Sequence, residues 1–212
     1  AYQKMNKKSL QVVIADDNRF FCEALKDSLN THSELNVTAT FCAIEEVINF
    51  TQNNYLDVLI LDVNFNGTSS LDFISEIKSA EKIFKIIALT TMNNNYIKDK
   101  ALENGVDVFI GKDTDFTNFK DEVLNCFTDK TNDKTTKSSK IIINNLVFTR
   151  RKLEILEALY RHSDKKEKEL SVILNITESA LKSHKRELFE ITNTKSTPEL
   201  IKFGIQKGLI VS

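Results

Sequence analysis

The sequence predicts two domains: an α/β domain on a doubly wound five-stranded parallel sheet, and then a small all-α helix-turn-helix domain. In the first half, short apolar runs alternate with amphipathic stretches, and residues 128–140 contain no apolar side chain. Beyond them only the helical period of apolar residues is found. We therefore expect one domain at 10–127, a linker at 128–145 and a second domain at 146–212.

Five short apolar runs are the candidates for the strands of the sheet. Their residues are continuously apolar rather than alternating, which is typical of parallel strands that helices cover on both faces. After each run, apolar residues recur at intervals of three and four, which predicts a helix. The strand candidates are 11–15, 36–41, 58–61, 84–89 and 106–110, and the helix candidates are 18–30, 44–53, 68–79, 94–104 and 114–127.

Helical periodicity predicts four helices in the second half, and a short turn separates two of them. Asn175 tolerates the left-handed backbone conformation that a tight turn requires, and Thr177 is a suitable cap for the next helix. Pro198, directly after Thr197, is a start signal for the last helix. This pattern is typical of a helix-turn-helix motif. The helix candidates are 150–162, 166–174, 178–191 and 198–208.

The charge of the chain is divided between its halves, although the net charge is only −1. Residues 1–129 contain 12 Lys and Arg against 20 Asp and Glu (−8), whereas residues 130–212 contain 17 against 10 (+7). The basic half suits a polyanionic partner. No apolar run approaches the roughly 20 residues of a membrane span, and no secretory signal is visible. We therefore expect a soluble, cytoplasmic protein that has no membrane partner.

Polar residues follow the strand candidates at the points where ligands collect in a doubly wound sheet. The first strand ends at Asp16 and Asp17, the third at Asp62, the fourth at Thr90 and the fifth shortly before Lys112. Singly, each has an ordinary explanation as a helix cap, a turn residue or a solvated charge. Together, three carboxylates, a hydroxyl and an ammonium are expected to converge on one edge of the sheet.

This set of side chains predicts a particular chemistry. Clustered carboxylates repel one another unless a cation lies among them, and oxygen ligands at this density suit Mg²⁺. A carboxylate beside Mg²⁺ can accept a phosphoryl group and form an acyl phosphate. The hydroxyl of Thr90 and the ammonium of Lys112 can then hold the phosphoryl oxygens. The sequence therefore predicts a magnesium-dependent phosphoryl-transfer site.

Four motifs lie at these strand ends: Val-Ile-Ala-Asp-Asp-Asn at 13–18, Asp-Val-Leu-Ile-Leu-Asp at 57–62, Ile-Ala-Leu-Thr at 87–90 and Phe-Ile-Gly-Lys-Asp at 109–113. With them, the first domain resembles the flavodoxin-like receiver domain of two-component response regulators. The intervals of 45 residues from the second aspartate to the third, 28 more to the threonine and 22 more to the lysine fit that family.

The resemblance implies the metal ligands and the phosphoacceptor. Asp62 would accept a phosphoryl group from a sensor histidine kinase. Mg²⁺ would be held by Asp17, Asp62 and the backbone carbonyl of Asn64, with Asp16 acting directly or through water. The Asn64 side chain could also orient a water towards the acyl phosphate and shorten its lifetime.

The resemblance also implies a switch. Thr90 and Lys112 would sense the phosphoryl group, and Phe109 would be the aromatic switch residue, acting by packing alone because it lacks the hydroxyl of tyrosine. The chain departs from the family at 65–67, where Phe-Asn-Gly replaces the usual Met-Pro before glycine, and at Arg19, which replaces a proline. These departures concern the shape of the loops rather than the chemistry.

The second half carries the motif Ile-Thr-Glu-Ser-Ala-Leu-Lys-Ser-His at 176–184. It is similar to the signature of the LuxR-type helix-turn-helix domain of the NarL/FixJ class, whose last helix commonly forms the dimer contact. The motif is followed by further basic residues, so that one face of the helix could enter the major groove of DNA. The family roles implied are base-edge contact for Lys182, Ser183 and Arg186, phosphate contact for Lys185, and packing or phosphate contact for His184.

The chain is therefore identified as a response regulator and not as an enzyme: a transcriptional regulator that binds double-stranded DNA, as a homodimer when phosphorylated. One alternative is a receiver whose basic helical domain binds protein instead of DNA. A second is a phosphatase of the haloacid dehalogenase type, but those enzymes need an aspartate as general acid two residues after the nucleophile. That position is Asn64 here.

Overall fold

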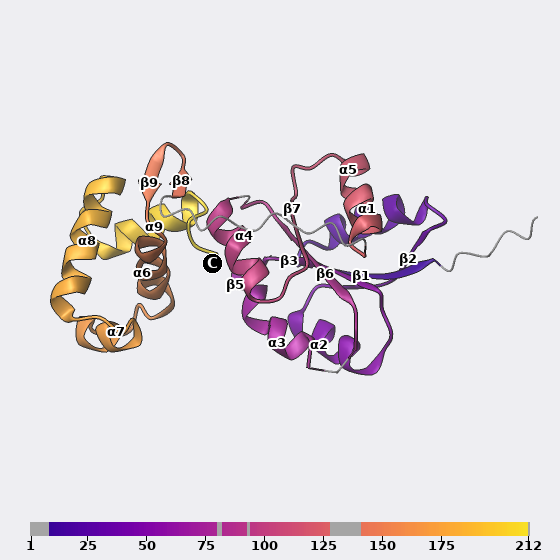
Figure 1. Cartoon of the computed structure of the whole chain (residues 1–212), viewed down its shortest axis with the longest axis horizontal. Coiled ribbons are helices and arrows are strands. Elements are labelled where there is room, and N and C mark those ends of the chain that lie inside the picture. The colour runs from indigo at the N-terminus through magenta and orange to yellow at the C-terminus, as the bar shows by residue number, and fades with distance from the viewer. Residues whose placement is uncertain (1–8, 80–81, 93, 128–140, 212) are drawn as a thin grey trace, which may run out of the picture. The chain divides into compact units, whose positions relative to one another are not determined.

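The computed structural model describes residues 9–79, 82–92, 94–127 and 141–211. The chain divides into two compact units, the first built mainly from residues before 128 and the second mainly from residues after 140 (Figure 1). In the described residues no helix has the length and apolar character needed to cross a bilayer. Most of the expected linker, residues 128–140, lies outside the described residues.

The first unit is the predicted parallel sheet, with the strand order β2-β1-β3-β6-β7. Each strand is within two residues of its predicted bounds. The order reverses next to β1, so the carboxyl ends of β1 and β3 lie side by side at the point where ligands bind in this class of sheet. The strands are β1 (Leu10–Ala15), β2 (Leu35–Phe41), β3 (Val58–Asp62), β6 (Lys85–Thr90) and β7 (Val108–Gly111).

Helices cover both faces of this sheet, as the continuously apolar strands predict. Helices α1 and α5 lie on one face, and α2 and α3 on the other (Figure 1). Alternate residues of one strand, such as Val12 and Ile14, pack with Leu25 of α1 and Val123 of α5. The helices are α1 (Arg19–Asn30), α2 (Ile44–Asn53), α3 (Ile74–Ile77), α4 (Asn95–Glu103) and α5 (Phe116–Asn125).

The segment after β3 differs from the predicted helix at 68–79. Strands β4 (Asn64–Phe65) and β5 (Thr68–Ser69) form a small antiparallel hairpin, and a 3-10 helix, η1 (Ser70–Phe73), then leads into α3. The turn is Asn66-Gly67, both with positive φ, 51° and 76°. An Asn-Gly pair favours this hairpin turn because both residues tolerate the left-handed region.

The second unit contains the four predicted helices, preceded by a hairpin that the sequence analysis did not predict. Residues 141–145, expected in the linker, form strand β8 and its turn, so the second unit is mainly rather than entirely helical. Asn144 and Asn145 make the turn with φ of 51° and 63°. The elements are β8 (Ile141–Ile143), β9 (Leu146–Phe148), α6 (Arg150–Arg161), α7 (Glu167–Ile173), α8 (Glu178–Thr192) and α9 (Thr197–Gln206).

Candidate functional site

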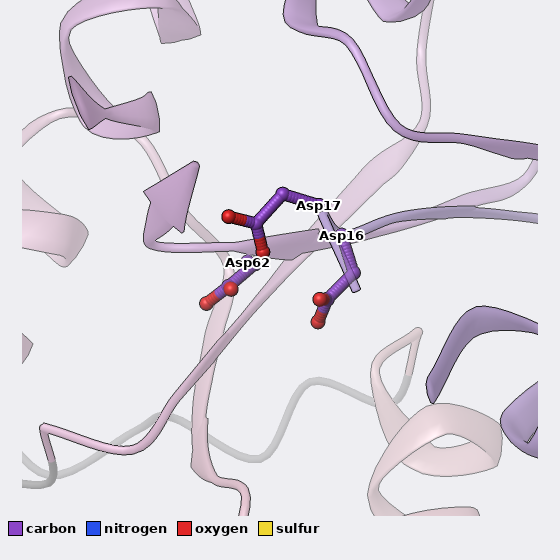
Figure 2. Close-up of side chains that lie close together, drawn as sticks. All are labelled: Asp16, Asp17 and Asp62. Atoms are coloured by element: carbon purple, nitrogen blue, oxygen red, sulfur yellow. The ribbon is translucent and has the colours of Figure 1, made fainter. Parts of the chain in front are cut away.

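Three carboxylates meet at the carboxyl edge of the sheet. Asp16 and Asp17 follow β1, and Asp62 is the last residue of β3. The pairing of Ala15 with Leu61 aligns the two strand ends. One carboxylate oxygen from each aspartate lies within 4.8 Å of the others, and Figure 2 shows the three side chains close together. The predicted convergence of these aspartates is therefore present in the structure.

Backbone amides hold two of these carboxylates in place. The N–H of Asn18 donates to Asp16 Oδ1 at 2.9 Å, and the N–H of Asn66 donates to Asp17 Oδ2 at 2.9 Å. Asn18 also caps α1 through its side chain, which accepts from the N–H of Phe21. Asp16 is buried, whereas Asp17 is exposed. The cluster thus has one buried side and one side open to solvent, as a site that exchanges a ligand requires.

Lys112 provides the positive charge of the site. It directly follows β7, and its Nζ lies 2.7 Å from Asp16 Oδ2 and 2.8 Å from Asp62 Oδ2. Its backbone N–H donates to the carbonyl of Thr90 at 2.7 Å, and its ammonium lies 4.9 Å from the ring centroid of Phe21. Burial favours a lower pKa for Lys112, but the hydrogen bonds to Asp16 and Asp62 outweigh it and raise this pKa above its ordinary value.

The charges of the site are not balanced by Lys112 alone. Burial raises the pKa of Asp62 to about 6, against the influence of Lys112 and helped by the negative charge of Asp16. Three carboxylates face one ammonium, so ionising all of them leaves an excess of negative charge. The donor set consists of hard carboxylate oxygens with an open side, which fits a divalent cation such as Mg²⁺.

Asn64 and Ser70 form hydrogen bonds with Asp62, the first with its carboxylate and the second with its backbone. The N–H of Asn64 donates to Asp62 Oδ1 at 3.3 Å, while its side-chain Oδ1 is buried without a hydrogen-bond partner. The hydroxyl of Ser70 donates to the backbone carbonyl of Asp62. Sequence reasoning missed Ser70 and Asn66, which reach the site only because of the β4–β5 hairpin. The Asn-Gly pair at 66–67 was the signal that could have found this hairpin.

Thr90 and Phe109 lie on the neighbouring strands. The pairing of Asp62 with Leu89 places Thr90 one residue further along the same edge. Thr90 is buried, and its hydroxyl accepts from the N–H of Met92 at 2.9 Å. Phe109 is half-buried in β7 and lines a cavity of about 400 Å³ together with residues of α4 and α5. The structure thus places the predicted switch residue in this cavity, on the strand that Lys112 directly follows.

The predicted DNA-binding residues all lie on α8, but they differ in exposure. The turn before α8 has Asn175 at φ 51°, and Thr177 caps the helix by accepting from the N–H of Ala180, as the sequence predicts. The side chains of Lys182 and Arg186 are 64% and 76% exposed. Ser183 and His184 are half-buried. Lys185, predicted to contact phosphate, is only 16% exposed and forms an ion pair with Glu167.

Comparison with known proteins identifies the first unit. The family model of the response regulator receiver domain matches residues 12–124. Similar proteins include the uncharacterized transcriptional regulatory protein YxjL of Bacillus subtilis, 23% identical over 222 residues, covering 97% of this chain and 100% of the relative. Another is the oxygen regulatory protein NreC of Staphylococcus carnosus, 24% identical over 217 residues, covering 95% and 99%.

The fold is similar to that of solved response regulators. RcsB from Salmonella enterica serovar Typhimurium, bound to the promoter rprA with a phosphomimetic, superposes with a TM-score of 0.58 at 19% identity and covers 94% of this chain and 99% of its own. The receiver domain of NarL from Mycobacterium tuberculosis has a TM-score of 0.53 at 23% identity and covers 56% and 96%. The receiver model spans more than half of the sequence, and the chain therefore belongs to the response regulator receiver family.

Proposed function

We propose that this chain is a phosphorylation-controlled, DNA-binding transcriptional regulator of a two-component system, of the NarL/FixJ class. The observation that carries the proposal is the convergence of Asp16, Asp17, Asp62 and Lys112 at one edge of the receiver sheet. The helix-turn-helix of the second unit and the similarity to a DNA-bound RcsB support a DNA partner.

The proposed metal site uses the acidic cluster. Asp17, Asp62 and the backbone carbonyl of Asn64 would hold Mg²⁺, with Asp16 acting directly or through water. When bound, Mg²⁺ offsets the excess negative charge and allows an anionic phosphoryl group to approach a carboxylate. The N–H groups of Asn18 and Asn66 keep two of the ligands oriented, which is the usual role of outer hydrogen bonds around a metal.

The proposed reaction is transfer of a phosphoryl group from a phosphohistidine of a sensor kinase. An oxygen of Asp62 attacks phosphorus, the P–O bond forms as the P–N bond breaks, and the released imidazole takes a proton from solvent. Lys112 already lies 2.8 Å from Asp62 and can hold a phosphoryl oxygen with its ammonium. The hydroxyl of Thr90 donates to another phosphoryl oxygen, and its oxygen remains free to accept from Met92.

The proposed output is a shift between two conformations of the receiver. The phosphoryl group draws Thr90 towards Asp62, where Lys112 already lies, and Phe109 repacks into the space beside β7. Two phosphorylated chains then form a homodimer, and their α8 helices bind two half-sites of double-stranded DNA.

The DNA-binding half of this proposal is tested with duplexes selected from a random pool. Acetyl phosphate and Mg²⁺ should tighten binding of the parent to the selected duplex, but not binding of Asp62→Asn. Lys182→Ala and Arg186→Ala should each reduce discrimination between selected and mismatched duplexes by about 1–3 kcal/mol, the value of a good bidentate base contact. If no duplex is bound in a salt-dependent manner, the second unit binds protein instead, and the DNA-binding proposal is wrong.

A further inference from the structure

Ion pairs fix the recognition helix α8 on two sides. Lys185 of α8 has its Nζ 2.7 Å from Glu167 Oε1 of α7, and Glu187 of α8 has its Oε2 2.9 Å from the Nζ of Lys152 in α6. The side chains of both lysines are largely covered, 16% and 15% exposed. Because its ammonium is held by Glu167, Lys185 connects α8 to α7, which packs against it (Figure 1).

The same carboxylate also approaches a second lysine of α8. Glu167 Oε2 lies 3.8 Å from the Nζ of Lys182, whose side chain is 64% exposed. The hydrogen bond from Lys185 lowers the pKa of Glu167, so this carboxylate is ionised at neutral pH. A negative charge beside Lys182 partly neutralises this exposed cation of α8, and it repels the DNA backbone.

We propose that Glu167 restrains DNA binding by this chain. It holds Lys185 as a positioning residue between the two helices, in place of the phosphate contact that the sequence predicts. Its negative charge beside Lys182 also lowers the positive potential of α8 and so lowers affinity for DNA of any sequence. Contacts to base edges from Lys182, Ser183 and Arg186 then make a larger contribution to the choice of site. This inference rests on the proposed DNA-binding function.

The test measures binding of the full chain to a fluorescent duplex of random sequence between about 50 and 200 mM salt. Glu167→Gln should bind about three- to tenfold more tightly at the lower salt, and the slope of log K against log salt should steepen by about one, as for one added phosphate contact. The matched control is Asp164→Asn, which removes the same charge from an exposed side chain that pairs only weakly with Lys165, at 3.4 Å. It should change affinity less than about twofold.

A second substitution separates a positioning role of Lys185 from a phosphate contact. Lys185→Met keeps the apolar stem and removes the charge. In the parent it should weaken binding, because the freed Glu167 then pairs with Lys182. In the Glu167→Gln background it should have little effect. A direct phosphate contact would instead cost the same affinity in both backgrounds, and thermal unfolding of each variant shows that it is folded.

The outcomes distinguish this inference from the function on which it rests. If the parent binds duplex DNA and Glu167→Gln behaves like Asp164→Asn, the restraining role of Glu167 is wrong, and the DNA-binding function stands. An equal loss from Lys185→Met in both backgrounds also contradicts the inference. If neither the parent nor Glu167→Gln binds any duplex at the lowest salt, the DNA-binding function itself fails and this inference fails with it.

Discussion

Asp62 is both the proposed phosphoacceptor and a carboxylate whose ionisation lowers the stability of the fold. Its carboxylate is buried next to Asp16, and burial raises its pKa to about 6, so that ionising it costs more free energy than ionising an ordinary aspartate. Ionisable groups with strongly shifted pKa values are common at functional sites, where reactive groups lower the stability of the fold. Both the stability and the phosphoryl chemistry of the receiver should therefore respond to changes at this carboxylate.

Replacing Asp62 should stabilise the metal-free chain. Its pKa is raised from 3.8 to about 6, so the folded state binds the proton more tightly than the unfolded state. The stability that this proton supplies is fully present below about pH 4 and is lost as the pH rises through about 6. Asp62→Asn, which cannot ionise, should raise the free energy of unfolding at about pH 7.5 by about 1–3 kcal/mol, and the gain should shrink towards about pH 4.

Urea unfolding with a chelator present measures this gain. Asp113→Asn, an exposed aspartate on the same loop as Lys112, is the control and should not show it. Millimolar Mg²⁺ should reduce the difference, because it stabilises the parent by binding the native state. An Asp62→Asn chain that is less stable than the parent at neutral pH without metal would contradict the assignment of Asp62 as a strained carboxylate.

Asn64 should control the lifetime of the phosphorylated chain. Its backbone N–H donates to Asp62, and its side-chain oxygen is buried without a hydrogen-bond partner, so we expect this oxygen to orient a water for hydrolysis of the acyl phosphate. Asn64→Ala should lengthen the half-life of the phosphoprotein by roughly tenfold, a modest value for loss of a group that positions a reacting water. Decay of the label after removal of the donor gives the rate. Asn53→Ala on α2 is the control and should decay like the parent. Equal half-lives for the parent, Asn64→Ala and Asn53→Ala would show that Asn64 does not control hydrolysis of the acyl phosphate.

At the scale of elements, the long repeating features were predictable and the short hairpins were not. Continuous apolar runs and a helical period identify the five strands and most helices, because each pattern is repeated over several residues. The hairpins β4–β5 and β8–β9 have strands of two or three residues, too short to establish a period. Their turns, Asn66-Gly67 and Asn144-Asn145, were the available signals.

The residues of the site that follow the strands were predictable, and the contacts around them were not. Asp16, Asp17, Asp62, Thr90 and Lys112 follow from the rule that ligands collect at the carboxyl ends of parallel strands. Contacts that depend on how elements pack do not follow from any rule of spacing. The hydrogen bond from the N–H of Asn66 to Asp17 depends on the β4–β5 hairpin. The ion pair of Lys185 with Glu167 depends on how α7 packs against α8.

The β4–β5 turn should support the metal site. Gly67 has φ 76°, which an L side chain adopts at a cost of roughly 1–2 kcal/mol. Gly67→Ala should lower the free energy of unfolding by about that amount and weaken Mg²⁺ binding, because Asn66 orients Asp17 from the same turn. Urea unfolding and a Mg²⁺ titration followed by calorimetry measure the two effects. Thr68→Ala, exposed on the same hairpin, is the control. An unchanged Mg²⁺ affinity in Gly67→Ala would show that the turn does not support the metal site.

At the scale of the whole molecule, the opposite charges of the two halves match their different proposed ligands. The net charge of −8 up to residue 129 belongs to the part that is proposed to bind a cation and accept a phosphoryl group, and the +7 from residue 130 onwards belongs to the part that is proposed to bind DNA. The proposed regulation needs only one chemical event, at Asp62, to change the association of the second unit with DNA.

The most direct test of this account is to map the phosphoryl group after incubation of the full chain with acetyl phosphate. The account predicts one added phosphoryl group on Asp62 in the presence of Mg²⁺, and none after chelation of the metal or in Asp62→Asn. A matched Asp113→Asn chain should be labelled like the parent. Labelling of Asp62→Asn to the same extent as the parent, or labelling of the parent that is indifferent to Mg²⁺, would contradict the central claim.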